Sequence, residues 1–152
     1  MLNQCVPNIE LAATNGQQIN LTALTGQFII LYFYPKDNTP GCTTESAAFR
    51  DAFAEFSALN VCILGVSRDS IKSHENFKSK LALPFELIAD VDEALCSAFN
   101  VIKMKNMYGK QARGIERSTF LINPEGKIIA EWRGVKVAEH VLAVLETLKA
   151  LL

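Results

Sequence analysis

The sequence lacks several features that mark common classes of protein. Its apolar runs fall well short of the ~18 residues that a membrane-spanning helix needs, and its formal net charge is only −1. A chain so close to neutral offers no broad electrostatic surface for nucleic acid or for an anionic membrane, so we expect neither as a partner. No basic segment followed by an apolar one opens the sequence. We therefore expect no signal peptide and a cytoplasmic location.

Cysteine and histidine are also scarce and widely spaced. The four cysteines are Cys5, Cys42, Cys62 and Cys96. They form no C-x-x-C pair, and the two histidines, His74 and His140, are far from them in the sequence. This spacing fits neither a disulfide scaffold nor a zinc site, so we expect no metal and no other cofactor. Both histidines fall in predicted helices, where we expect them on solvated faces.

The bulk composition is that of an ordinary globular protein. The chain has 152 residues, of which 49% are apolar and 20% charged. This length is enough for one domain with a real core. Because the sequence contains no linker, repeat or low-complexity tract, we predict a single domain over residues 1–152.

Strand and helix patterns alternate along the first half of the chain. Residues 9–13 and 17–22 flank Asn15-Gly16, which indicates a β-hairpin. The run F-I-I-L-Y-F-Y, from Phe28 to Tyr34, is typical of a strand buried on both faces, and Pro35 ends it. The spacing of the phenylalanines in residues 42–58 predicts an amphipathic helix.

The same alternation continues to the carboxyl end. We predict strands over 61–66, 85–89, 118–123 and 127–132, a helix over 71–82 capped by Ser70, and a short helix over 92–99. A last helix presents Val137, Val141, Val144, Leu145 and Leu148 on one face. The order predicts an α/β protein, with a central mixed β-sheet flanked by helices and an N-terminal β-hairpin extension.

One loop is unusually stiff for a connection between strand and helix. It reads Y-P-K-D-N-T-P-G-C-T-T-E, from Tyr34 to Glu45. Two prolines fix the backbone, Gly41 allows a ligand to approach it closely, and Thr39 offers a hydroxyl near Cys42. The first turn of a helix favours an anion, and the thiolate is the reactive form of a cysteine. Alone, Cys42 could be a half-buried residue at a helix start, but a structural cysteine has no use for such a loop.

The loop and much of the remaining chain resemble the peroxiredoxins. Pro35-x-x-x-Thr39-x-x-Cys42 matches the peroxidatic motif, and the longer stretch resembles the bacterioferritin comigratory protein branch, also called PrxQ. The likeness includes G-V-S-R-D-S (65–70), D-E-A-L-C-S-A-F-N-V (92–101), N-M-Y-G-K (106–110) and I-E-R-S-T-F-L-I-N-P-E-G-K (115–127). It implies a thioredoxin-like fold and reduction of hydrogen peroxide and organic hydroperoxides.

The resemblance also implies a role for each motif residue. Cys42 would be the peroxidatic cysteine, whose thiolate becomes a sulfenic acid. Pro35 and Thr39 would shape the pocket, and Arg117 would be the motif arginine that stabilises developing charge. Glu45, which we predict in the first helical turn, would orient that arginine.

The sequence departs from the family at the resolving cysteine. Many relatives carry a second cysteine five residues after the first or on the next helix, and these positions are Ala47 and Lys78 here. We expect Cys62 and Cys96 to pack in the core, and Cys5, near the N-terminus, to be a bystander. The hypothesis is therefore a one-cysteine cycle, resolved by thioredoxin or by glutathione with glutaredoxin.

Other functions share parts of this pattern. A disulfide oxidoreductase would need a second cysteine where Glu45 stands. A peroxide-responsive redox sensor or a chaperone that uses Cys42 as a switch stays open, as does a structural thioredoxin-like module. Relatives in this branch are often monomers, which we expect here. Their pocket helix commonly unwinds locally, and whether it does so in this chain is a separate question.

Overall fold

The computed structural model describes residues 1–152, apart from the side chain of Met107. Its centre is a sheet in the order β5-β4-β3-β8-β9. The strands are β3 (Phe28–Phe33), β4 (Val61–Ser67), β5 (Glu86–Ala89), β8 (Ser118–Ile122) and β9 (Ile128–Arg133). The first three run parallel, whereas β8 and β9 are antiparallel to their neighbours, so the predicted mixed sheet is confirmed.

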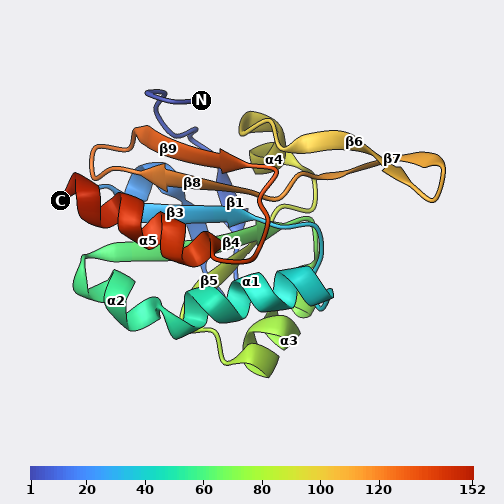
Figure 1. Cartoon of the computed structure of the whole chain (residues 1–152), viewed down its shortest axis with the longest axis horizontal. Helices are drawn as coiled ribbons and strands as arrows, with labels where there is room; N and C mark the ends of the chain where they lie inside the picture. Colours follow the sequence, from blue (N-terminus) through green and yellow to red (C-terminus); the bar gives the residue numbers. More distant parts are fainter.

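Each face of the sheet is covered by its own set of elements (Figure 1). One core contains side chains of α1 (Pro40–Asp51), α2 (Phe53–Ala58), α3 (Ile71–Leu81) and α5 (His140–Leu151). The other contains side chains of α4 (Ala94–Ala98), of strand β2 (Gln18–Asn20) and of the short 3-10 helix η1 (Leu21–Leu24). Strand β2 pairs with β1 (Glu10–Ala12), so the predicted N-terminal hairpin is confirmed.

The side chains of β3 point alternately into the two cores. Ile30 and Tyr32 face the core built from α1, α2, α3 and α5, whereas Ile29, Leu31 and Phe33 face the opposite one. Successive strand residues point to opposite faces, and a strand covered on both sides must be apolar throughout. The apolar run in the sequence therefore predicted the central strand correctly.

The helix predicted over residues 42–58 differs from the structure at its start and in its middle. It begins at Pro40, because proline suits the first helical position, where no N–H partner is needed. It is interrupted at Ala52, which separates α1 from α2. Glu45 therefore lies in the second turn, not the first as predicted, and the first turn contains no acidic residue.

A second hairpin, between the helix α4 and the strand β8, was not predicted. Strands β6 (Ile102–Met107) and β7 (Lys110–Ile115) pair with each other and project from the body of the molecule (Figure 1). The turn between them is Tyr108-Gly109, both with positive φ, in place of the usual Asn-Gly or Asp-Gly. The last helix also begins later than predicted, at His140, so Val137 precedes it.

Both histidines are buried, so the prediction of solvated faces was wrong. His74 is 0% exposed and His140 is 6% exposed. Each ring finds hydrogen-bond partners inside the protein: the Ile88 carbonyl and Asp37 for His74, and the Thr119 hydroxyl for His140. A polar ring can be buried when its nitrogens are satisfied in this way. No helix among the described residues has the length and apolar character needed to cross a membrane.

Candidate active site

Cys42 lies at the carboxyl end of β3, in the first turn of α1, and its side chain is fully buried. The helix N-cap is Thr39, whose hydroxyl donates to the Lys36 carbonyl oxygen at 2.7 Å and closes the loop on itself. The free backbone N–H groups of a helix start surround the sulfur with positive potential.

Arg117 connects the sulfur to a buried carboxylate. Its Nη2 donates to Cys42 Sγ at 3.4 Å, and its Nη1 donates to Glu45 Oε1 at 2.7 Å. Arg117 directly precedes Ser118, which pairs with Phe33 at the carboxyl end of β3. The antiparallel register of β8 on β3 therefore brings the guanidinium to the loop that carries Cys42, 75 residues away in sequence.

Glu45 is fully buried beside Arg117. Burial raises the pKa of Glu45 to about 7, and the charge and hydrogen bond of Arg117 only partly offset that rise. Its second oxygen, Oε2, is buried and has no hydrogen-bond partner among the described residues. Among the described residues Arg117 is the one charged partner of Glu45, and their hydrogen bond orients the guanidinium beside the sulfur.

Gly41 makes room for this guanidinium. A Cβ atom at position 41 would lie 3.0 Å from Arg117 Nη2. From the sequence we expected Gly41 to admit a ligand to the backbone, and the structure shows Arg117 in that space. Any larger residue at 41 would therefore press on the arginine that contacts the sulfur.

A cleft of about 540 Å³ opens over this arrangement. It is lined by Pro35, Thr39, Gly41 and Arg117, together with residues of the β6–β7 hairpin. Four further cations line it, namely Lys36, Arg68, Lys105 and Arg113. Arg68 and Arg113 are ion-paired with Glu93, at 2.9 and 2.6 Å. The structure thus brings together all the predicted site residues, with Cys42 and Glu45 buried beneath the cleft.

None of the other three cysteines lines this cleft, and all four are free thiols. Cys62 and Cys96 pack into the core on the opposite face of the sheet from Cys42. Cys5 pairs with Lys127, next to the turn that faces the amino end of β3. The six residues of β3, roughly 20 Å long, therefore separate the edge where Cys5 lies from the edge that carries the Cys42 loop. The first residues of the chain are held by backbone hydrogen bonds, including Val6 N to the Gly126 carbonyl at 2.9 Å.

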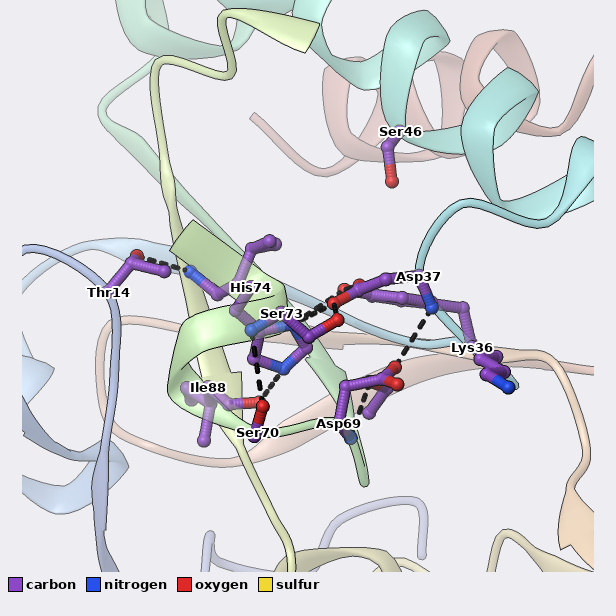
Figure 2. Close-up of polar contacts among 12 residues, drawn as sticks. Thr14, Lys36, Asp37, Ser46, Asp69, Ser70, Ser73, His74 and Ile88 are labelled. Atoms are coloured by element: carbon purple, nitrogen blue, oxygen red, sulfur yellow. Dashed lines mark hydrogen bonds and ion pairs between the residues drawn. The ribbon is translucent and has the colours of Figure 1, made fainter. Parts of the chain in front are cut away.

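A buried polar cluster behind the active-site loop was not singled out from the sequence (Figure 2). Asp37 and His74 meet there although they are 37 residues apart. Asp37, Asp69 and His74 bring potential metal-ligand atoms within 4.8 Å of one another, and these groups are hydrogen-bonded within the cluster. The clue in the sequence was His74 three residues before the core residue Phe77, which places both on one helical face.

Comparison with known proteins decides the family. The model of the AhpC/TSA family matches residues 2–131. The peroxiredoxin Bcp of Xanthomonas campestris pv. campestris is 56% identical over 143 residues, which cover 94% of this chain and 89% of that protein. The chain is a peroxiredoxin of the AhpC/TSA family. The peroxiredoxin Bcp of Bacillus subtilis is 50% identical over 148 residues, which cover 97% of the peroxiredoxin described here and 94% of that protein.

Solved structures give the same assignment. A cysteine-to-serine variant of Xylella fastidiosa PrxQ is 45% identical, with a TM-score of 0.94 over 99% of this peroxiredoxin and 96% of that chain. A cysteine-to-serine variant of Xanthomonas campestris peroxiredoxin Q is 56% identical, with a TM-score of 0.91 over 95% and 92% of the two chains. A second variant of that protein has a different cysteine replaced. The number of residues between the two replaced positions is the same as that between Cys42 and Lys78 in this chain. The thioredoxin-like fold, the thiol peroxidase activity and the PrxQ resemblance are confirmed.

Proposed function

We propose that Cys42 is the peroxidatic residue of this thiol peroxidase, acting on hydrogen peroxide and organic hydroperoxides. The Cys42 thiolate attacks one peroxide oxygen, the O–O bond breaks, and an S–O bond forms. The sulfur loses two electrons and becomes a sulfenic acid, while the other oxygen leaves as water or an alcohol after it takes up a proton. The observation that carries this proposal is the hydrogen bond from Arg117 to Cys42 Sγ at 3.4 Å.

Each neighbouring residue has a part in this step. Arg117 and the backbone N–H groups of the helix start stabilise the charge that grows on the leaving oxygen, because they are already oriented toward the reacting atoms. Glu45 holds Arg117 in place. Pro35 and Thr39 border the cleft and limit the access of water to the sulfur. Gly41 leaves the space that the guanidinium occupies.

The cleft supports organic hydroperoxides as substrates alongside hydrogen peroxide. Its volume of about 540 Å³ is far more than hydrogen peroxide fills. A solved structure of the Xanthomonas campestris bacterioferritin comigratory protein is described in terms of alkyl peroxide reduction activity. We extend that substrate class to this peroxiredoxin.

A one-cysteine cycle follows from the placement of the thiols. The positions of the usual resolving cysteines hold Ala47 and Lys78. Cys62 and Cys96 are separated from Cys42 by the sheet, and Cys5 lies at its other end. An outside thiol would therefore attack the sulfenic acid, forming a mixed disulfide and water, and a second thiol would release the enzyme. Because Cys42 is fully buried, the first turn of α1 must move to expose it.

The physiological setting is part of the same proposal. The reductant would be thioredoxin, or glutathione with glutaredoxin, and the whole chain would act as one domain. We propose a monomer that works in the cytoplasm without nucleic acid or membrane partners. Sedimentation of the reduced and oxidised protein tests the monomer directly.

Steady-state peroxidase assays test the catalytic assignment. Cys42→Ser should abolish turnover with either reductant, whereas Cys62→Ser and Cys96→Ser should retain it. Sustained turnover also distinguishes a peroxidase from a sensor, which reacts once per oxidation. Full activity of Cys42→Ser would refute the assignment, and loss of activity in Cys5→Ser would refute the one-cysteine cycle alone.

A further inference from the structure

Asp37 anchors the active-site loop from behind through several hydrogen bonds (Figure 2). Its Oδ1 accepts from the Tyr34 hydroxyl at 2.6 Å, and its Oδ2 accepts from the Ser73 hydroxyl at 2.8 Å. His74 Nδ1 lies 2.8 Å from the same Oδ2. The backbone N–H of Asp37 donates to Asp69 Oδ2 at 2.9 Å. Both the side chain and the backbone of this loop residue are therefore fixed.

The partners of His74 determine where its protons are. Its Nε2 lies 3.0 Å from the Ile88 carbonyl oxygen, which can only accept a hydrogen bond. Burial raises the pKa of Asp37, but hydrogen bonds from His74, Tyr34 and Ser73 outweigh it and hold the pKa below its ordinary value. An ionised carboxylate is also only an acceptor. Both ring nitrogens of His74 therefore face acceptors, an arrangement that the ring satisfies fully only when both nitrogens donate, as an imidazolium paired with Asp37.

This ion pair, which we call the Asp37–His74 clamp, joins three parts of the fold. Asp37 belongs to the loop between β3 and α1, His74 to α3, and the Ile88 carbonyl to β5. Pro35 and Thr39 lie two residues on either side of Asp37 and line the cleft over Cys42. A displacement of Asp37 would therefore move both of them.

Stability alone does not explain such a clamp. Its two side chains are 0% and 1% exposed, so both charges have been removed from water. Replacing a buried ion pair with apolar residues of similar size is often neutral or stabilising. A buried pair does, however, impose a specific geometry, because its hydrogen bonds are satisfied in only one arrangement. The clamp is thus better suited to positioning the loop than to strengthening the fold.

We propose that His74 is a positioning residue for the reaction of Cys42 with peroxide. As an imidazolium it fixes Asp37, and through Asp37 it fixes Pro35 and Thr39 at the mouth of the site. This inference rests on the proposed role of Cys42 as the peroxidatic thiol. A misplacement of about 1 Å in an active site can cost about 10²-fold in rate, so the loop need not unfold for the effect to be large.

The test compares two reactions of the same thiol. The rate constants of Cys42 with hydrogen peroxide and with iodoacetamide are measured for the native protein and for His74→Phe. Peroxide reduction needs the ordered pocket, whereas alkylation needs only an accessible thiolate. We expect His74→Phe to lower the peroxide rate about tenfold or more, with no loss in the alkylation rate. An equal change in both rates, or no change in the peroxide rate, would overturn the proposal.

Substitutions at Asp37 provide a rescue that a structural role would not predict. An asparagine with its oxygen at the Oδ1 position can accept from Tyr34, while its NH2 group donates to Ser73 Oγ and to a neutral His74, so Asp37→Asn should retain the peroxide rate within about threefold. Asp37→Ala should lose about as much as His74→Phe. Phe56→Leu, a buried change in α2 away from the clamp, is the matched control, with lower stability and an unchanged ratio of the two rates.

Nitrogen NMR of the His74 ring provides a readout that is independent of catalysis. We expect both ring nitrogens to be protonated in the native protein and only one in Asp37→Asn. A neutral ring in the native protein would overturn the clamp as stated. Absence of any reaction of native Cys42 with peroxide would instead refute the proposed function, so the two failures are distinguishable.

Discussion

Arg117 is the residue on which the chemistry of this peroxiredoxin depends. It reaches Cys42 Sγ and Glu45 Oε1 with two nitrogens of one planar group. A guanidinium can hold two acceptors in a fixed geometry, whereas a lysine ammonium is a single point charge on a flexible stem. The contact with Glu45 thus orients the nitrogen that faces the sulfur.

Arg117→Lys should therefore lower the rate of Cys42 with hydrogen peroxide by about 10²- to 10³-fold, the cost of losing one preorganised donor. Stopped-flow measurement of the single oxidation step gives this rate without interference from the reductant. Lys103→Arg, an exchange between the same two residue types outside the cleft lining, is the control. A lysine variant with the native rate would show that charge alone suffices.

Gly41→Ala should reduce the same rate several-fold without a large loss of stability. The added Cβ would lie 3.0 Å from Arg117 Nη2, so the guanidinium must shift by a few tenths of an ångström. The backbone at position 41 is helical, so alanine itself is tolerated there. The oxidation rate and the unfolding midpoint are measured together, and a variant with an unchanged rate would place the arginine elsewhere in solution.

The raised pKa of Glu45 should make the free energy of unfolding depend on pH. Its folded pKa is raised from 4.5 to about 7, so its favourable contribution is complete below pH 4.5 and is lost as the pH rises through 7. Glu45→Gln removes this titration but keeps an oxygen that can accept from Arg117. Between pH 4.5 and 8 the native protein should lose up to about 3 kcal/mol relative to the variant. Denaturant unfolding at several pH values measures it, and parallel curves for the two proteins would contradict it.

At the scale of elements, the apolar patterns of the sequence predicted those strands and helices that pack against the two cores. The β6–β7 hairpin was missed because its strands carry charged residues such as Lys103, Lys105 and Arg113 and pair only with each other. The break at Ala52 was missed because alanine is the best helix former, so nothing local indicates it.

Some residues of the site could be predicted from the sequence, and others could be found only in the folded structure. The motif around Cys42 and the match at Arg117 could be recognised along the chain. The clamp could not, because it joins Asp37 to His74 across 37 residues and each side chain alone suits a solvated surface. Burial of Glu45 also depends on where α1 begins, which the sequence placed two residues too late.

The N-cap of α3 allows a test of stability apart from chemistry. Ser70 Oγ accepts from the Ser73 N–H at 3.2 Å. Ser70→Ala should cost about 1 kcal/mol in unfolding free energy, because that donor loses its partner. Ser79→Ala, at an exposed position of the same helix, should change the free energy by less than about 0.5 kcal/mol. Both variants should oxidise at the native rate, and a slow Ser70→Ala would mean that the cap supports the active-site loop.

At the scale of the whole molecule, the sheet separates the reactive thiol from possible partners. Cys42 belongs to the core on one face, and Cys62 and Cys96 to the core on the other. Burial raises the pKa of Cys62 to about 11, with a smaller contribution from Glu86. Burial also raises the pKa of Cys96, together with the hydrogen bond and charge of Asp90. Both thiols are thus poor nucleophiles, and the sheet separates them from Cys42.

The most direct test of this account is intact mass and peptide mapping after one equivalent of hydrogen peroxide, with a sulfenic-acid trap present. We expect one trap adduct on Cys42, with Cys5, Cys62 and Cys96 recovered as free thiols. An adduct on a different cysteine, or an internal disulfide between Cys42 and any of the other three, would contradict it.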